Sequence, residues 1–223
     1  MTTFQRARSD EQREIRRRAI LETAASMLAE MPVSEVSLNE LSRRVGLAKS
    51  NVLRYFESRE AVLLELQLSL ARDFFAETAE QLPAAVDADA PAPDRVAGIA
   101  AALAAAFAAQ PMLCELISSQ AAVLEHNVST ETITSYKLAG YPLLVELGAA
   151  VQALLPELSD QAVGEAIRTI LLLVGALWTH SHPPQAVRDA YAADPRLTFL
   201  PEGFTGSLER SIRIVLRGLL AGA

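Results

Sequence analysis

Residues 37–56, SLNELSRRVGLAKSNVLRYF, concentrate the side chains of this chain that could recognise a nucleic acid. Lys49, Asn51 and Arg54 lie on a short predicted helix, on faces that packing does not need. Asparagine and arginine can each form paired hydrogen bonds with a base edge in the DNA major groove, and lysine can bind a phosphate. These residue types at this spacing indicate DNA binding.

Two short helices joined by a glycine turn are expected to position these side chains. Ser37 opens the first helix with a capping-box pattern, and Gly46 ends it with the backbone freedom that a helix end commonly uses. The second helix is predicted over residues 48–56, held to its neighbours by Val52 and Phe56. This arrangement is a helix-turn-helix, a unit that can place its second helix in the major groove.

The rest of the chain also predicts helices, because apolar residues recur every three or four positions and alternating runs are absent. The fold class is therefore all-α. A loop is expected over 83–93, and 183–202 is predicted to be a connection with at most a short helix. Gly140 and Pro142 predict a break or a kink, because proline removes a helix hydrogen bond. The other helices are predicted over residues 9–30, 58–82, 94–109, 111–126, 129–155, 160–181 and 203–221.

Composition and charge exclude several classes of protein. The chain is 51% apolar and has one cysteine, which excludes a disordered chain and an internal disulfide framework and favours the cytoplasm. The net charge is −7, but residues 1–60 carry eleven basic and nine acidic side chains, while 61–223 carry nine and eighteen. No secretory signal or membrane span is expected, because the apolar run 170–178 is far shorter than the roughly 20 residues a span needs. A basic end on an acidic body is typical of a localised anion-binding surface, although a solvated helix face would look the same.

Three motifs within residues 15–66 carry a family resemblance: Ser37–Ser42 (SLNELS), Val45–Lys49 (VGLAK) and Phe56–Leu63 (FESREAVL). In this order, after a long first helix, they resemble the TetR family of transcriptional regulators, the tetracycline-repressor-like group. The resemblance implies an N-terminal three-helix DNA-binding domain over 1–57 and a larger helical ligand-sensing and dimerisation domain over 58–223. It also implies a repressor that binds a palindromic operator as a homodimer and is released by a small molecule.

Two positions depart from the family pattern. Leu53 stands where the family usually has a tyrosine that touches a phosphate, so this interaction is expected to be missing or passed to Tyr55. Arg59 replaces a frequent lysine, and arginine can still bind phosphate through two hydrogen bonds.

Nine residues are expected to face double-stranded operator DNA. Asn51 and Arg54 are the expected base readers, and Ala48 and Ser50 are expected near a thymine methyl group or a base edge. The expected phosphate contacts are Ser37, Arg44, Lys49, Tyr55 and Arg59. Arg6 and Arg8 form an arm that is expected either to reach the DNA or to remain disordered.

Two amphipathic helices at the carboxyl end suit a two-fold, four-helix dimer interface, as in TetR-like proteins. A palindrome reader needs this symmetry, although both stripes could instead face only the core of their own domain. The stripes consist of Ala166, Ile170, Leu173, Leu177, Leu208, Ile212, Val215, Leu216 and Leu219.

The resemblance also implies a ligand pocket among the helices between residues 60 and 178. An apolar lining favours a small hydrophobic or aromatic effector with one or two polar groups. The candidate lining residues, each of which could instead be plain core, are Phe74, Phe75, Phe107, Met112, Cys114, Leu116, His126, Tyr136, Tyr141 and Trp178. His126, Tyr136 and Trp178 are favoured because each combines an apolar body with a polar group.

Two other function classes compete with a regulator. A helical enzyme lacks support, because the sequence has no phosphate loop, nucleophile elbow or HExxH motif. A helical adaptor that binds only protein would leave the basic helix-turn-helix unexplained. No cofactor or metal is expected, since His180 and His182 would not share a helix face and isolated Cys114 is typical of a small buried hydrophobe.

Overall fold

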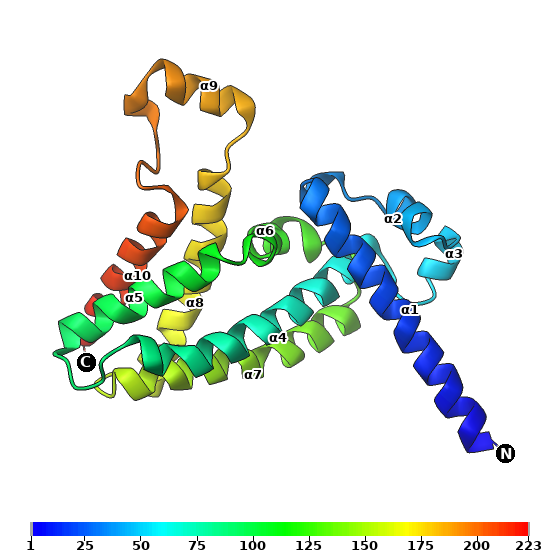
Figure 1. Cartoon of the computed structure of the whole chain (residues 1–223), viewed down its shortest axis with the longest axis horizontal. Helices are drawn as coiled ribbons and strands as arrows, with labels where there is room; N and C mark the ends of the chain where they lie inside the picture. Colours follow the sequence, from blue (N-terminus) through cyan, green and yellow to red (C-terminus); the bar gives the residue numbers. More distant parts are fainter. Residues whose placement is uncertain (1, 223) are drawn as a thin grey trace. The chain divides into compact units, whose positions relative to one another are not determined.

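A computed structural model describes the backbone of residues 2–222 and the side chains of residues 11–222 (Figure 1). All regular structure in residues 2–222 is helical, which confirms the all-α prediction. A 3-10 turn at Val33–Glu35, a π-helical segment η2 at Gln120–Leu124 and a 3-10 turn at Pro195–Leu197 separate some of the α-helices. These helices are α1 (Thr2–Glu30), α2 (Leu38–Val45), α3 (Lys49–Val52), α4 (Arg59–Ala85), α5 (Ala92–Ala108), α6 (Pro111–Ser119), α7 (Thr130–Leu154), α8 (Asp160–Ser181), α9 (Gln185–Ala193) and α10 (Gly203–Ala221).

The chain divides into two compact units. The first unit contains Met1–Ser69 and Ser119–Tyr136, and the second contains Leu70–Ser118 and Lys137–Ala223. Helices α4 and α7 contribute to both units because each crosses a boundary in sequence. The predicted functional division between residues 57 and 58 stays a prediction, and the expected arm at Arg6 and Arg8 lies outside the described side chains.

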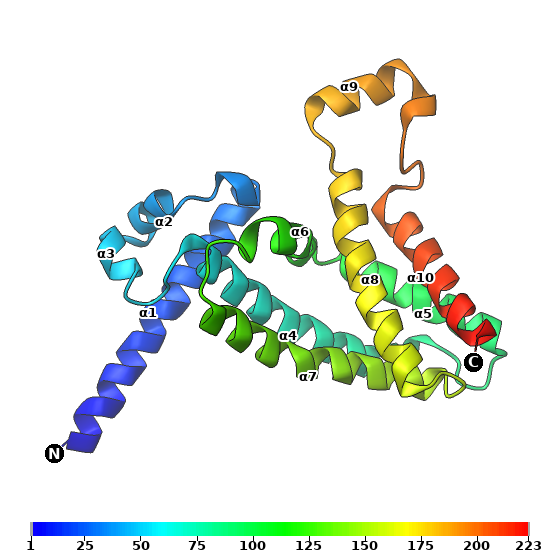
Figure 2. The same ribbon diagram turned by 180° about the vertical axis from the view of Figure 1, so that it is seen from behind.

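The core of the first unit fixes the helix-turn-helix against its long neighbours. Ile20 and Met27 of α1, Leu41 of α2, Val52 of α3 and Leu63 of α4 are all fully buried. Figures 1 and 2 show α2 and α3 beside α1. The burial of large apolar side chains, each contributing roughly 1.5–3 kcal/mol, therefore determines where the short α3 lies.

The second unit is built around α5 and α10. Helix α10 packs against α5 and α8 (Figure 2). Leu103 and Phe107 of α5 and Leu208 and Ile212 of α10 are fully buried in this core. Helix α9 has no buried residue and lies beyond the ends of α8 and α10 (Figures 1 and 2).

Several predicted boundaries are wrong. Helix α3 covers only Lys49–Val52, and turns complete the predicted second helix. Helix α4 continues to Ala85, beyond the predicted end at 82, and contains Pro83, which removes one backbone hydrogen bond. Burial of Leu82 and Val86 packs this last turn against the core. Of the predicted break or kink in α7, the break is absent, because one continuous helix contains Pro142. Proline removes a single backbone hydrogen bond, and the helix is packed after it through the buried Leu147 and Val151.

Helix α8 is long and apolar enough, by length and composition, to cross a membrane, and so is the bent pair Ala92–Ala108 with Pro111–Leu124. Core helices pass the same test. Val163, Ile167 and Val174 of α8 lie in the core of the second unit. This packing accounts for the apolar character of the inner face of α8.

Candidate nucleic-acid interface

The turn between α2 and α3 is fixed by local hydrogen bonds. The Ser37 hydroxyl accepts a hydrogen bond from the Glu40 backbone N–H at 3.2 Å and caps the start of α2. Gly46 ends α2 with φ at +71°, in the left-handed region that glycine adopts without strain. The Leu47 N–H then donates to the Ser42 carbonyl at 3.0 Å and closes the turn.

Helix α3 and the turn after it have one buried and one exposed face. Val52 and Phe56 point into the core, at 0% and 4% exposure. Tyr55 is half-buried. The predicted DNA-facing residues that are exposed are Ser37, Ala48, Lys49, Ser50, Asn51 and Arg54. The predicted inner face is therefore confirmed, and the predicted outer residues of this segment are exposed except for Tyr55, although contact of the exposed face with DNA stays a prediction.

Arg17 of α1 connects the end of residues 48–56, here called the recognition segment (α3 with the turn that follows it), to α4. Its Nη1 donates to the Tyr55 carbonyl at 2.9 Å, and its guanidinium lies 4.5 Å from the centre of the Phe56 ring. Its Nη2 forms an ion pair with Glu65 of α4. Charge–ring attraction and the two polar contacts hold the carboxyl end of the recognition segment between two long helices.

Two predicted phosphate ligands are already paired inside the protein. Arg44 forms ion pairs with Glu30 at 2.7 Å and with Glu40 at 2.8 Å. Hydrogen bonds from Arg43 and Arg44 lower the pKa of Glu40 to about 2, so this carboxylate is ionised at neutral pH. The positive charge of Arg44 is thus matched by acidic neighbours, and a phosphate would have to compete with them.

Arg59 is similarly engaged. Its Nη1 donates to the Val36 carbonyl at 2.9 Å, and its Nη2 pairs with Glu60 at 2.9 Å. Glu60 is buried, so removing Arg59 would leave a buried carboxylate without this partner. The geometry gives Arg59 an evident structural role at the start of α4.

Other basic side chains in this region are unpaired. Among the side chains of residues 11–222, Lys49 and Arg54 have no ion-pair partner, and neither do Arg13 and Arg16 of α1. All four are exposed. An unpaired exposed cation can bind a phosphate without first breaking an internal ion pair, so these four are better placed than Arg44 and Arg59.

A polar hollow joins α1 to the recognition segment. It has a volume of about 490 Å³ and is lined by Gln12, Arg13, Arg16, Asn51, Arg54 and Tyr55. Three of these were predicted DNA-facing residues, whereas Arg13 and Arg16 were not placed in the site. Arg13 and Arg16 are three residues apart, so the sequence shows that they share one face of α1. The spacing does not show which other element lies beside that face.

The predicted ligand-pocket residues do not gather in one place. The rings of Phe74, Phe75 and Phe107 form a buried stack in the second unit, with centroids of Phe74 5.1 Å from Phe75 and 4.6 Å from Phe107. Cys114 is buried in the same core, and burial raises the pKa of its thiol to about 12. A neutral thiol in an apolar core matches the predicted small hydrophobe.

The remaining pocket candidates are divided between the two units, and Trp178 lies in the same core as the three phenylalanine rings. Trp178 packs edge-on against Phe204, and its indole N–H donates to Glu115 at 3.0 Å. Leu116 is buried and Met112 partly buried. His126 is exposed and belongs to the first unit, as does half-buried Tyr136, whereas the aromatic stack belongs to the second.

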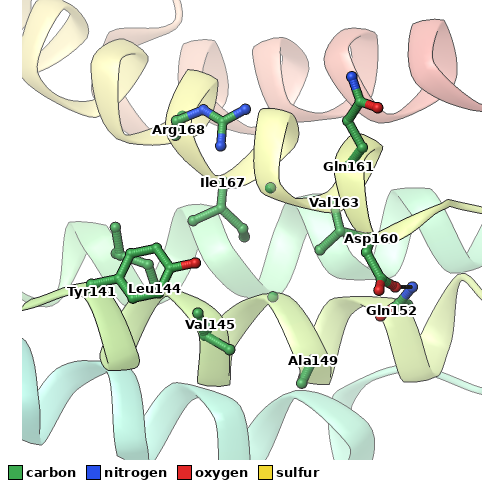
Figure 3. Close-up of a pocket in the computed structure, with 12 residues that line it drawn as sticks. Tyr141, Leu144, Val145, Ala149, Gln152, Asp160, Gln161, Val163, Ile167 and Arg168 are labelled. Atoms are coloured by element: carbon green, nitrogen blue, oxygen red, sulfur yellow. Dashed lines mark hydrogen bonds between the residues drawn. The ribbon is translucent and has the colours of Figure 1, made fainter.

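Tyr141 lines a groove of about 540 Å³ between α7 and α8 in the second unit (Figure 3). Gly148 brings the two helices close, since a Cβ there would lie 3.2 Å from a methyl carbon of Val163. The Gln152 amide donates to Asp160 at 2.7 Å at one end of the groove (Figure 3). No other predicted pocket residue lines this groove.

The predicted dimer stripes divide into buried and partly exposed residues. Ala166, Ile170, Leu208, Ile212 and Leu216 are core residues of their own unit. Leu173, Leu177, Val215 and Leu219 are only partly buried, and the neighbouring Leu172 and Ile214 are 75% and 65% exposed. The stripes predicted from helix periodicity therefore contain two kinds of residue. Some lie on the side of α8 or α10 that faces the core of the unit, and the others lie at the edge of the outer side.

The predicted end of α8 at the histidines is confirmed. His182 follows the last helical residue, and its Nδ1 hydrogen-bonds the Trp178 carbonyl at 3.0 Å. His180 instead contacts the Phe199 ring. Within the described residues, no group of three potential metal ligands is found.

Comparison with known proteins agrees with this architecture. Residues 20–66 match the family described as bacterial regulatory proteins, tetR family, and residues 71–223 match the tetracyclin repressor-like C-terminal domain. A TetR-family transcriptional regulator of Mesorhizobium loti superposes with a TM-score of 0.51 over 94% of this chain and 97% of its own, at 17% identity. This likeness concerns the fold.

Curated relatives match over a shorter stretch. The HTH-type transcriptional regulator EthR of Mycobacterium tuberculosis and that of Mycobacterium bovis are each 40% identical over 48 residues. The match covers 22% of this chain and 22% of each relative, so the chain spans about a fifth of the length of the curated relatives it matches. Because the two family matches together cover most of the sequence, the chain belongs to the TetR family of bacterial transcriptional regulators.

Proposed function

We propose that the protein is a repressor that binds a palindromic DNA operator as a homodimer and is released by a small hydrophobic or aromatic molecule. The observation that carries this proposal is the polar hollow, where Arg13 and Arg16 of α1 adjoin Asn51 and Arg54 of the recognition segment. Unpaired guanidinium groups beside a short exposed helix form a surface suited to a groove and its flanking phosphates.

In this proposal, the two kinds of contact have separate tasks. Asn51 and Arg54 read base edges, since asparagine suits adenine and arginine suits guanine. Lys49, Arg13 and Arg16 bind phosphates, which fixes the position of the helix without reading sequence. Removing one phosphate ligand should reduce the steepness with which affinity falls with salt by about 0.9 on a log–log plot.

The salt dependence of binding tests the assigned phosphate ligands. We expect the double variant Arg13→Ala/Arg16→Ala to weaken binding to all duplexes alike and to flatten the salt slope of the dimer by up to about 3.6, because each of the two subunits loses two phosphate ligands. Fluorescence anisotropy over a sodium chloride series measures both effects. Arg72→Ala, at an exposed arginine of α4 in the second unit, is the control for the loss of one positive charge outside the interface, and it is compared with each single variant, Arg13→Ala and Arg16→Ala. An unchanged slope in the double variant would remove α1 from the interface.

We further propose that the outer faces of α8 and α10 form the dimer interface. Support comes from Leu172 and Ile214, large apolar side chains exposed on these helices beside the partly buried Leu173 and Val215. A charge placed in the middle of an apolar interface is unfavourable unless it is paired. An interface in this position would give the two recognition segments the symmetry of a palindrome.

Replacing Leu172 and Ile214 together with aspartate is therefore expected to yield folded monomers at micromolar concentration. Both side chains are exposed, so the core of the unit should be unaffected. Sedimentation velocity measures the mass, and Leu138→Asp at an exposed position of α7 is the control, expected to remain dimeric. A monomeric unmodified protein under the same conditions would contradict this interface.

A further inference from the structure

Four polar side chains of the first unit form a continuous hydrogen-bonded chain that the proposed DNA contacts do not use. The Gln120 amide nitrogen donates to Glu125 at 2.6 Å, and the Gln67 amide nitrogen donates to the Gln120 amide oxygen at 2.8 Å. The Tyr136 hydroxyl donates to the same Gln120 oxygen at 3.1 Å. The chain thus joins α4, the segment η2 with the residue that follows it, and α7.

The direction of these hydrogen bonds is determined by the carboxylate at one end. Because Glu125 accepts, Gln120 must present its nitrogen to Glu125 and its oxygen to Gln67. Gln67 must in turn present its nitrogen to Gln120. Burial and the negative charge of Glu125 raise the pKa of Tyr136, so its hydroxyl keeps the proton that it donates.

One acceptor at the end of this series of hydrogen-bonded side chains has no partner. Gln67 is 3% exposed, and its amide oxygen is the buried side-chain atom without a hydrogen bond among residues 11–222. The Gln120 oxygen already accepts two hydrogen bonds, which fills both of its lone pairs. Buried polar groups are normally hydrogen-bonded, so the Gln67 oxygen is a buried acceptor that no protein group uses.

The backbone beside this acceptor is unusual as well. Gln120 begins the π-helical segment, and the Glu125 N–H donates to the Gln120 carbonyl five residues earlier at 3.0 Å. Single π-helical turns are rare and occur frequently at functional sites. Gln120 and Tyr136 are partly exposed, so one side of the hydrogen-bonded series of side chains is open to solvent.

We propose that the Gln67 amide oxygen binds the polar group of a small neutral molecule that carries a hydrogen-bond donor, a hydroxyl or an amide N–H. The ligand must be a donor because the unused atom is an acceptor. We expect it to be neutral because Leu63 and Leu64, one turn earlier on α4, are buried, and because Gln120 lies between the Gln67 oxygen and the carboxylate of Glu125. This inference rests on the proposed ligand-released function and assigns the polar part of the effector.

Matched fragments test the inference on the full-length protein. Benzyl alcohol and benzamide carry the donor, whereas benzyl methyl ether and N,N-dimethylbenzamide do not. We expect NMR titrations to show at least tenfold weaker binding of each blocked fragment than of its parent. Equal binding of the blocked and parent fragments, or no binding of either parent, would overturn the site.

Two variants locate the binding. Gln67→Met keeps the length of the side chain but lacks the acceptor, and is expected to weaken benzamide binding at least tenfold. Tyr136→Phe removes a donor to Gln120 but leaves the Gln67 oxygen in place, so binding should remain within about twofold of the unmodified protein. Full affinity in folded Gln67→Met would overturn the assignment, and if that variant does not fold the comparison of fragments still decides.

Operator affinity, measured in parallel, separates this site from the proposed function. If benzamide binding depends on Gln67 but leaves operator affinity unchanged, the site is supported. The proposal that a ligand bound at this site releases the protein from DNA is then contradicted. Operator binding with no uptake of either donor fragment would overturn the site alone.

Discussion

Replacing Arg54 with alanine is expected to weaken operator binding by about 1–3 kcal/mol in each half-site, roughly 5–150-fold in affinity per half-site. Arg54 is exposed, lines the polar hollow with Asn51 and has no ion-pair partner among the described side chains. Its guanidinium is therefore free to form two hydrogen bonds with a guanine edge. Fluorescence anisotropy with operator and with random duplex of equal length measures the change.

The comparison of the two duplexes distinguishes base reading from phosphate binding. A base reader should lose much more affinity for the operator than for random DNA, whereas a phosphate ligand should lose the same on both. Arg72→Ala controls for the loss of one positive charge from the chain. Equal losses on both duplexes would remove Arg54 from the base readers.

Replacing Arg95 with methionine is expected to lower the free energy of unfolding by about 3 kcal/mol. Arg95 is 8% exposed in the second unit, where its Nε donates to the Ala90 carbonyl at 2.9 Å. It also donates to the Leu154 carbonyl at the end of α7 and forms an ion pair with Glu157. Methionine retains most of the apolar stem but leaves two carbonyls and a carboxylate without this donor.

Urea denaturation of the unmodified protein and of the Arg95→Met variant measures the loss in free energy of unfolding. Arg196→Met is the matched control, because Arg196 pairs with Asp194 on the surface, where an ion pair contributes little. We expect the control to unfold at the same urea concentration as the unmodified protein. If the urea midpoint shifts equally in the two variants, the contacts of Arg95 do not stabilise the packing of the start of α5 against the end of α7.

The helix-turn-helix could be predicted from the sequence because its determinants are local. Ser37 caps the helix that begins next to it, and Gly46 ends the same helix. Val52 and Phe56 are four residues apart and therefore share a face. Such short-range patterns predict the two helices and the turn without knowledge of any contact that is distant in sequence.

The availability of each basic residue could not be predicted in this way. Arg44 pairs with Glu30, fourteen positions earlier, and Arg59 donates to the carbonyl of Val36, twenty-three positions earlier. These contacts depend on how α1, α2 and α4 pack together. Residue type identifies a potential phosphate ligand, but tertiary structure determines whether a carboxylate already occupies it.

The same limit explains the carboxyl-terminal helices and the continuous α7. Periodicity places Ile212 and Leu216 on one stripe of α10, but it does not show that this stripe meets α5 and α8 rather than a partner. Pro142 is a local signal for a break, yet packing of the residues after it maintains the helix.

Selection of bound sequences from a pool of random duplexes tests the central claim most directly. A dimer that presents two copies of α3 should enrich an inverted repeat whose half-sites lie about one helical turn apart, roughly 34–36 Å between their centres. The same selection with Arg54→Ala should lose preference at one base pair in each half-site. Enrichment of no sequence by the unmodified protein, or of a single asymmetric site, would contradict a dimeric operator-binding regulator.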